Sequence, residues 1–291
     1  MNQRLRNLLG TDSLLPYWLL LPSLVFVGVF FLMPLFQAIG LAFRGDAGFT
    51  LAYFKKMVSD VRFFDALKYT FLLAITIVPL QLVTALAMAL LLNKSFRGSR
   101  FFLYLFALPL GISDLAAGLI WLSIFTHRGF LNSILYTLGI LEKPIHYLSY
   151  QNVGFTFLAV VAAEHWRATA IVMVILVAGL QMISKDYLEA AEVLGARGWK
   201  KTWYVILPLL KPSLQSALII RTIFALQTFA VVLALAGQIT PVLAGEAYFW
   251  QFLYRDSHVA SAYAVLLMVI SITMTWVYLR YLGAKTGGMR G

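Results

Sequence analysis

Six long runs of apolar residues constrain the fold of this chain more than any other feature of its sequence. They cover residues 14–43, 69–92, 101–125, 153–183, 214–237 and 259–282. A helix needs about 20 apolar residues to cross the hydrocarbon core of a bilayer, and every run is long enough. Charged residues make up only 12% of the chain, about half the share typical of soluble domains. We therefore expect an all-α, polytopic membrane protein with six transmembrane helices.

The distribution of Lys and Arg predicts which side of the membrane each connector faces. The loop after the second run carries Lys94, Arg97 and Arg100, and short cationic loops remain in the cytoplasm. The first run is too long for the apolar core of a signal peptide, so we expect it to be retained. The expected topology is N-in, C-in, with a cytoplasmic N-terminus at 1–13, a transmembrane domain at 14–282 and a cytoplasmic tail at 283–291.

A polar stretch at about 184–213 separates the fourth and fifth runs and is expected in the cytoplasm. Its first part has the spacing of a short amphipathic helix. We expect one small, apolar face, made by Tyr187, Ala190, Ala191 and Leu194. Asp186, with Glu189 three residues later, predicts an N-terminal cap, and Gly195 and Gly198 can adopt the positive φ that ends a helix. Pro208 and Pro212 predict a break or kink at the entry to the next span.

This polar stretch resembles a known motif. Glu189-Ala190-Ala191, Gly195 and Leu207-Pro208 have the spacing of the EAA loop in permease subunits of bacterial and archaeal ABC importers. Val205 stands where the motif has isoleucine, which is a mild departure. In that family the loop is a coupling helix that inserts into a cleft on the ATP-hydrolysing subunit. The alternative is an ordinary amphipathic loop that docks on no other protein.

Further positions extend the resemblance to carbohydrate-type permeases, the relatives of the maltose and glycerol-phosphate systems. They include Leu108-Pro109, Gly118 to Trp121, Trp166, and Ala178 to Gln181. The chain departs from the family pattern at Phe229-Ala230 and at Gln238 to Pro241, which bears on substrate identity. The resemblance implies a multi-pass permease of the inner (plasma) membrane that imports a sugar or related polar solute by alternating access. It also implies a second homologous permease, two ATP-binding subunits and an extracytoplasmic substrate-binding protein as partners.

The chain has no recognisable chemistry of its own. Gly195 and Gly198, which precede Lys201 and Thr202, have the wrong spacing for a phosphate-binding loop. ATP and Mg are therefore expected on the partner subunits, with no cofactor, metal site or catalytic residue in this chain. The four histidines are dispersed, and there is no cysteine. The net charge of +11 comes from scattered loop residues rather than from a basic face, so we do not expect nucleic-acid binding.

Polar residues inside the runs are the candidates for a substrate path. A charged side chain facing lipid near the bilayer centre costs about 2.5–3.5 kcal/mol on insertion scales, so such residues should face the bundle interior or an aqueous path. Besides Asp114, the candidates are Glu164, Trp166, Arg167, Arg221 and Gln227. Glu164 and Arg167 are three residues apart and could pair on one helix face. The alternatives are a structural ion pair, an Arg221 that reaches the membrane surface, and a Trp166 and Gln227 that simply pack.

Two other classes of function would require different sequence features. A secondary transporter driven by an ion gradient would have broken helices with ion-coordinating carboxylates near mid-membrane. Asp114 is the only obvious acid in that position. An intramembrane enzyme would need a nucleophile with a base, or a metal cluster, and the sequence contains no convincing set. The importer permease is therefore the favoured function.

Overall fold

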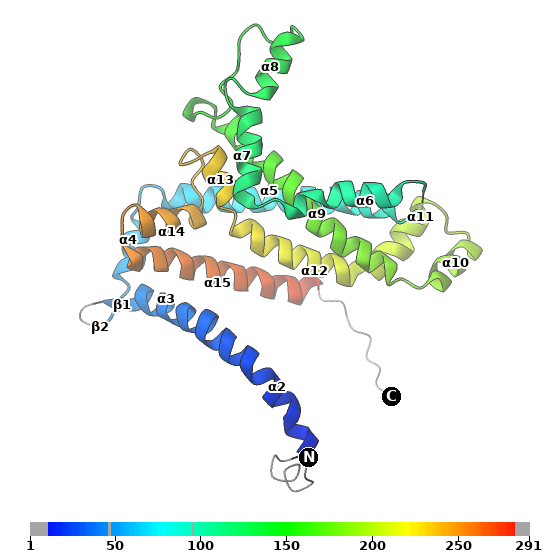
Figure 1. Cartoon of the computed structure of the whole chain (residues 1–291), viewed down its shortest axis with the longest axis horizontal. Helices are drawn as coiled ribbons and strands as arrows, with labels where there is room; N and C mark the ends of the chain where they lie inside the picture. Colours follow the sequence, from blue (N-terminus) through cyan, green and yellow to red (C-terminus); the bar gives the residue numbers. More distant parts are fainter. Residues whose placement is uncertain (1–10, 46–47, 95, 283–291) are drawn as a thin grey trace.

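The computed structural model describes residues 11–45, 48–94 and 96–282 (Figure 1). Most of these residues belong to helices, and the short strands β1 (Arg44–Gly45) and β2 (Gly48–Phe49) form an antiparallel hairpin. The all-α, polytopic fold expected from the apolar runs is confirmed. Residues 1–10 of the predicted N-terminus and the whole predicted tail at 283–291 lie outside the described residues.

The helices follow one another with short interruptions. The N-terminal third contains α2 (Thr11–Val27), the π-helical turn η1 (Gly28–Leu32), α3 (Met33–Phe43), α4 (Ala52–Val58) and α5 (Phe63–Leu92). The middle contains α6 (Ser99–Ala107), the 3-10 turn η2 (Leu108–Gly111), α7 (Asp114–Phe125), α8 (Phe130–Thr137), η3 (Tyr150–Asn152) and α9 (Val153–Gln181). The last part contains α10 (Lys185–Val193), α11 (Trp199–Lys201), η4 (Thr202–Ile206), α12 (Leu207–Leu226), α13 (Ala230–Leu235), α14 (Leu243–Phe252) and α15 (Ser257–Leu282).

Within the described residues, five helical stretches are long and apolar enough to cross a membrane. They are Pro16–Phe43, Phe63–Leu92, Tyr150–Gln181, Trp199–Leu226 and Ser257–Arg280. A sixth span is obtained when α6 and the α7–α8 segment, which meet at a bend of 102°, are counted together. The bend follows from local sequence. Pro109 lacks a backbone N–H, and the Ser113 hydroxyl accepts a hydrogen bond from the Ala116 amide at 3.2 Å, which starts a new helix.

The fifth apolar run was expected as a span at 214–237, and these boundaries are wrong. The helix α12 already begins at Leu207, ends at Leu226 and is followed by the separate helix α13. The prolines explain the early start. Pro208 lies in the first turn of α12, where no intrahelical N–H is needed, and the π-helical turn η4 precedes it. Hydropathy alone detects neither feature.

Helices α5, α9 and α12 pack together and form the centre of the bundle. One apolar cluster joins α5 and α9 to α13, and another joins α5 and α9 to the first half of α12. Small residues allow the close approach. A Cβ at Gly179 would lie 2.6 Å from the Cβ of Ser213, and one at Gly118 would lie 2.6 Å from the Cβ of Ala234. These contacts bring α9 against α12 and α7 against α13, as is usual between membrane helices.

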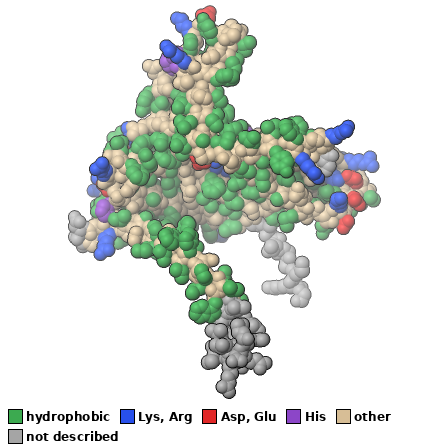
Figure 2. Space-filling model, in the orientation of Figure 1, with side chains coloured by type: hydrophobic (Ala, Val, Ile, Leu, Met, Phe, Trp, Pro, Cys, Tyr) green, Lys and Arg blue, Asp and Glu red, His purple; other side chains and the backbone are tan. Residues whose placement is uncertain are grey.

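The N-terminal helix diverges from this bundle. Only its α3 part packs on α15, while α2 projects away (Figure 1). None of its most apolar window is buried. The charged side chains in view gather mainly around α10 and α11, around the projecting α8 segment, and near the β1–β2 hairpin (Figure 2). Apolar side chains cover much of the surface between these regions, as expected for a protein that spans a bilayer.

The N-in, C-in topology can be tested with single cysteines, because the chain contains none. Asn93 follows α5 and is exposed, and Glu142 is exposed in the connector before α9. We predict that Asn93→Cys resists a membrane-impermeant thiol reagent added to intact cells, whereas Glu142→Cys reacts. Permeabilised cells provide the control, since both variants should then react. The opposite labelling pattern in intact cells would exclude this orientation.

Candidate functional site

The polar stretch after α9 folds into the short helix α10, with a different cap from the one predicted. Ser184 is the N-cap, and its hydroxyl accepts a hydrogen bond from the Asp186 amide at 3.3 Å. The prediction that Asp186 caps the helix is therefore wrong. Asp186 instead lies in the first turn, where its carboxylate still faces the positive end of the helix dipole. The serine takes the cap because its own backbone is extended, with ψ of 140°.

Two glycines end α10 and reverse the chain. Gly195 has φ of +84° and Gly198 has φ of +54°, which confirms the predicted role of both residues. The Ala196 amide donates to the Ala191 carbonyl at 2.8 Å, and this bond closes the end of the helix. An ion pair of 2.6 Å between Glu192 and Lys201 ties the helix to the returning chain. The hydrogen bond from Lys201 lowers the pKa of Glu192.

The predicted apolar face of α10 is divided between the interior and the solvent. Ala191 is 7% exposed and packs against its own chain, while Glu189 and Ala190 are exposed. Val193 and Leu194 are 87% and 86% exposed. The exposure of Val193 was not predicted from the sequence. Helical spacing does not indicate which of two apolar faces of a helix packs against the rest of the protein. The outward surface of α10 therefore combines an acid, a small residue and two aliphatic side chains.

Leu207 and Pro208 do not belong to this outward surface. They form the first turn of α12, directly after η4. The short elements α11 and η4 therefore connect α10 to α12 on one side. On the other side, α10 is joined to α9 by a linker of only a few residues.

A chain of polar contacts crosses the bundle and joins most of the charged candidates. Glu164 on α9 is fully buried and accepts a hydrogen bond from Arg221 Nη2 of α12 at 2.9 Å. Arg221 Nε also donates to Gln81 Oε1 of α5. The Gln81 amide in turn donates to the Glu164 carbonyl oxygen at 2.8 Å. Sequence analysis missed Gln81, although a glutamine inside an apolar span is a detectable signal.

The same chain of contacts ends at a more exposed ion pair. Arg167 Nη2 lies 3.1 Å from both carboxylate oxygens of Glu164, which confirms the expected pairing on α9. Arg167 Nη1 lies 2.8 Å from Asp114 Oδ1, at the start of α7. The Asp114 side chain is 53% exposed and that of Arg167 18%, whereas Glu164 and Arg221 are buried. We refer to Gln81, Asp114, Glu164, Arg167 and Arg221 as the buried ionic network.

Trp166 and Gln227 lie outside this network. Trp166 packs edge-to-face on Trp121, with ring centroids 6.2 Å apart. Gln227 is the C-cap of α12 and is exposed at the break before α13. The structure thus brings together Glu164, Arg167 and Arg221. It places Trp166 in an aromatic contact and Gln227 at a helix break.

Comparisons with known proteins identify similar permeases. The family model described as "Binding-protein-dependent transport system inner membrane component" matches residues 81–283. A glycerol-3-phosphate transport permease of Agrobacterium fabrum is 29% identical over 290 residues, covering 95% of this chain and 97% of the relative. A glycerol-3-phosphate permease of Brucella abortus is 31% identical and covers 93% of this chain and 95% of the relative. A trehalose/maltose permease of Thermococcus litoralis is 29% identical and covers 92% and 94%.

Solved structures support the same fold. A chain of a bacterial ABC transporter involved in the import of the acidic polysaccharide alginate superposes with a TM-score of 0.81. It is 18% identical in sequence, and the match covers 96% of this chain and 98% of the other. The family model covers well over half of the chain, and the curated relatives cover nearly all of it. The chain therefore belongs to the family of inner membrane components of binding-protein-dependent transport systems.

Proposed function

We propose that this permease imports a sugar or a related polar solute and is driven by ATP hydrolysis on separate subunits that dock on α10. The observation that carries the proposal is the outward surface of α10, where aliphatic side chains are almost fully exposed in a charged loop. Exposed apolar side chains of this kind are typical of a surface that binds another protein. The names of the relatives, which transport glycerol-3-phosphate or trehalose and maltose, support the substrate class.

The docking mode is a short helix in a groove, with Val193 and Leu194 as apolar anchors and Glu189 at the rim. Ala190 keeps the exposed face narrow, while Ala191 holds α10 on its own chain. Because α10 is joined to both α9 and α12 and is braced by the Glu192–Lys201 ion pair, a push on it moves the cytoplasmic ends of both spans. Alternating access then follows from a lever that acts on the centre of the bundle.

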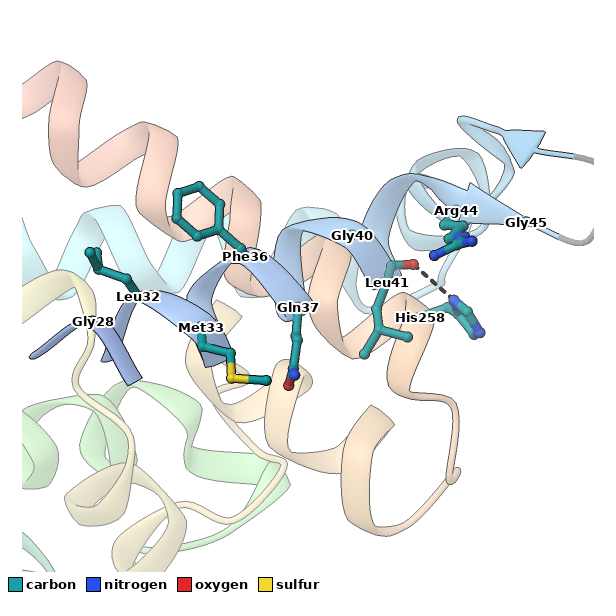
Figure 3. A pocket seen from close by; sticks show the side chains of 10 residues that line it. All are labelled: Gly28, Leu32, Met33, Phe36, Gln37, Gly40, Leu41, Arg44, Gly45 and His258. Carbon is teal, nitrogen blue, oxygen red and sulfur yellow. Dashed lines mark hydrogen bonds between the residues drawn. The ribbon is translucent and has the colours of Figure 1, made fainter. Parts of the chain in front are cut away.

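A second permease subunit fits the gap between the diverging N-terminal helix and the bundle. A cavity of about 1050 Å³ is lined mainly by η1, α3 and β1, with His258 from α15. Figure 3 shows Met33, Phe36 and Gln37 of its lining projecting from α3. Gly28 in η1 and Gly40 in α3 leave open space beside the backbone, which allows a partner helix to approach closely. No residue in the apolar window of this helix is buried within the described residues, so its surface is available to such a partner.

The projecting α8 segment is suited to contact a substrate-binding protein. Phe130, Tyr136 and Leu138 are exposed on it. Asn132 anchors the segment, because its amide donates to the carbonyls of His127 and Ile145 and accepts from the Ile145 amide. The related alginate transporter has been solved in complex with a periplasmic protein that carries a pentasaccharide, which supports a partner of this kind. The proposed topology places α8 outside the cell.

The residues proposed for the substrate path differ in their accessibility, and we assign them different roles. Glu164 and Arg221 are inaccessible and hold α9 to α12. Arg167 and Trp166 are partly accessible, and Gln227 is exposed beside a helix break. The second candidate function, an ion-driven transporter, is favoured only by the break before Asp114. There the carboxylate is already neutralised by Arg167, which argues against ion coordination.

The docking surface predicts a specific loss of association. Val193→Asp places a charge on the proposed apolar contact and should weaken binding of the ATP-binding subunit by about 1.5–3 kcal/mol, roughly tenfold or more. Val61→Asp is the matched control, because Val61 is 94% exposed in the turn before α5. Co-purification of the ATP-binding subunit from membranes measures the effect. Equal retention in both variants would argue against docking on α10.

The buried ionic network predicts unequal stability losses. Glu164→Gln leaves two guanidinium groups without their shared buried carboxylate, and we expect a loss of about 3–5 kcal/mol. Asp114→Asn removes the exposed end of the same network and should cost at most about 1 kcal/mol. Thermal unfolding in detergent compares the two variants. A similar loss for both substitutions would contradict the assignment of Glu164 as the central contact.

A further inference from the structure

A second cluster of buried polar groups lies at the opposite end of the bundle from α10. Glu246 on α14 is 1% exposed, and neither of its carboxylate oxygens has a hydrogen-bond partner among the described residues. The hydroxyl of Tyr263 on α15 and the Nη1 atom of Arg62, at the start of α5, are likewise buried without a partner there. Buried polar groups without partners are rare in folded proteins and call for an explanation.

The charged groups around Glu246 are mostly engaged elsewhere. Asp60, in the turn before α5, accepts from the Arg62 amide at 2.9 Å and from Trp250 Nε1 at 3.0 Å. Lys56 on α4 is bound to Asp256 at 2.8 Å. On α15, the His258 ring contacts the Leu41 carbonyl. Arg62 Nη1 and the Tyr263 hydroxyl are therefore the groups left for Glu246. The Arg62 guanidinium is a cation suited to an ionised carboxylate. The Tyr263 hydroxyl is a neutral group suited to a protonated carboxyl group.

Helix α14 lies outside the stretches that qualify as membrane spans, and burial raises the pKa of Glu246 to about 7. The positive charge of Arg62 opposes this rise, and the negative charge of Asp60 adds to it. An ionised Glu246 beside Asp60 leaves the cluster with one net negative charge, while a protonated Glu246 leaves it neutral. A single proton is thus sufficient to balance the cluster.

The position of α14 bears on the break between α12 and α13. Gly245 lies next to Glu246, and a Cβ at Gly245 would be 3.7 Å from the Phe229 ring. The Tyr248 ring of α14 packs on the same phenylalanine, with centroids 4.8 Å apart. Phe229 is the N-cap of α13 and lies two residues after the exposed Gln227. A shift of α14 is therefore transmitted to the break between α12 and α13.

We propose that Glu246 is a proton-binding site through which the pH at this end of the bundle sets the packing of α14 and the shape of the break between α12 and α13. In the protonated state the neutral carboxyl group hydrogen-bonds to Tyr263. In the ionised state the carboxylate requires Arg62, and α14 moves toward the start of α5. The proposed topology places this site outside the cell, so external pH would regulate the transporter independently of the docking of ATP-binding subunits.

The sign of the pH dependence follows from the raised pKa. The ordinary value for glutamate is 4.5 and the folded value is about 7, so the folded protein binds this proton more tightly than the unfolded chain does. Stability is therefore highest below about pH 4.5, falls as the pH rises to about 7, and no longer changes with this group at higher pH.

The test compares the melting temperature of the full chain between pH 5 and 8.5 with that of two variants. We expect the wild type to lose about 5–10 °C between pH 5 and 7.5. Glu246→Gln, which mimics the protonated form, should show no such loss, and Glu142→Gln, an exposed control, should follow the wild type. The same slope in Glu246→Gln as in the wild type would overturn the proposal.

Two measurements keep the test valid if Glu246→Gln does not fold. Infrared difference spectra of the wild type should show the carbonyl stretch of a protonated carboxyl group disappearing between pH 6 and 8, and its absence at pH 6 would overturn the proposal. A cysteine at position 227 reports on the helix break. In Gln227→Cys, thiol labelling should change with a midpoint near pH 7, and a rate that follows only thiol ionisation would exclude transmission to the break.

Discussion

The buried ion pair between Glu164 and Arg221 joins α9 to α12 at the centre of the bundle. Two charges inside a membrane bundle are tolerated only when their hydrogen bonds are satisfied. Here Gln81 binds Arg221, and Arg167 binds the same carboxylate. This requirement fixes α5, α9 and α12 relative to one another at the level of the network. The close contact between Gly179 and Ser213 fixes α9 and α12 again nearer to α10.

The proposed function depends on the segments that are joined to α5, α9 and α12. At one end, α10 is connected to α9 and α12 by short segments and exposes aliphatic side chains. On the side of α7, the network ends in the accessible Asp114–Arg167 ion pair, next to the 102° bend. Under the proposed function, the three central helices form a rigid centre, α10 is the docking helix that moves it, and the helix breaks change shape around it.

Much of the fold could be predicted, because apolar runs report directly on the bilayer as a solvent. Gly195 and Gly198 were also predictable, since a positive φ strongly favours glycine. The break between α6 and α7 was not predicted, because hydropathy averages over Pro109 and Ser113. The inward position of Ala191 and the partners of Arg221 depend on residues distant in sequence. Sequence analysis therefore found the charged candidates, but it could not determine which of them meet.

We infer that α5, α9 and α12 move as one body when ATP acts through α10. Distances between spin labels in the assembled transporter, with and without ATP, test it most directly, and the chain has no cysteine to remove. Val83 on α5, Leu119 on α7 and Ile220 on α12 are accessible for labelling. The claim predicts that ATP leaves the Val83–Ile220 distance unchanged and shifts the Leu119–Ile220 distance. A change between Val83 and Ile220 as large as that between Leu119 and Ile220 would contradict it.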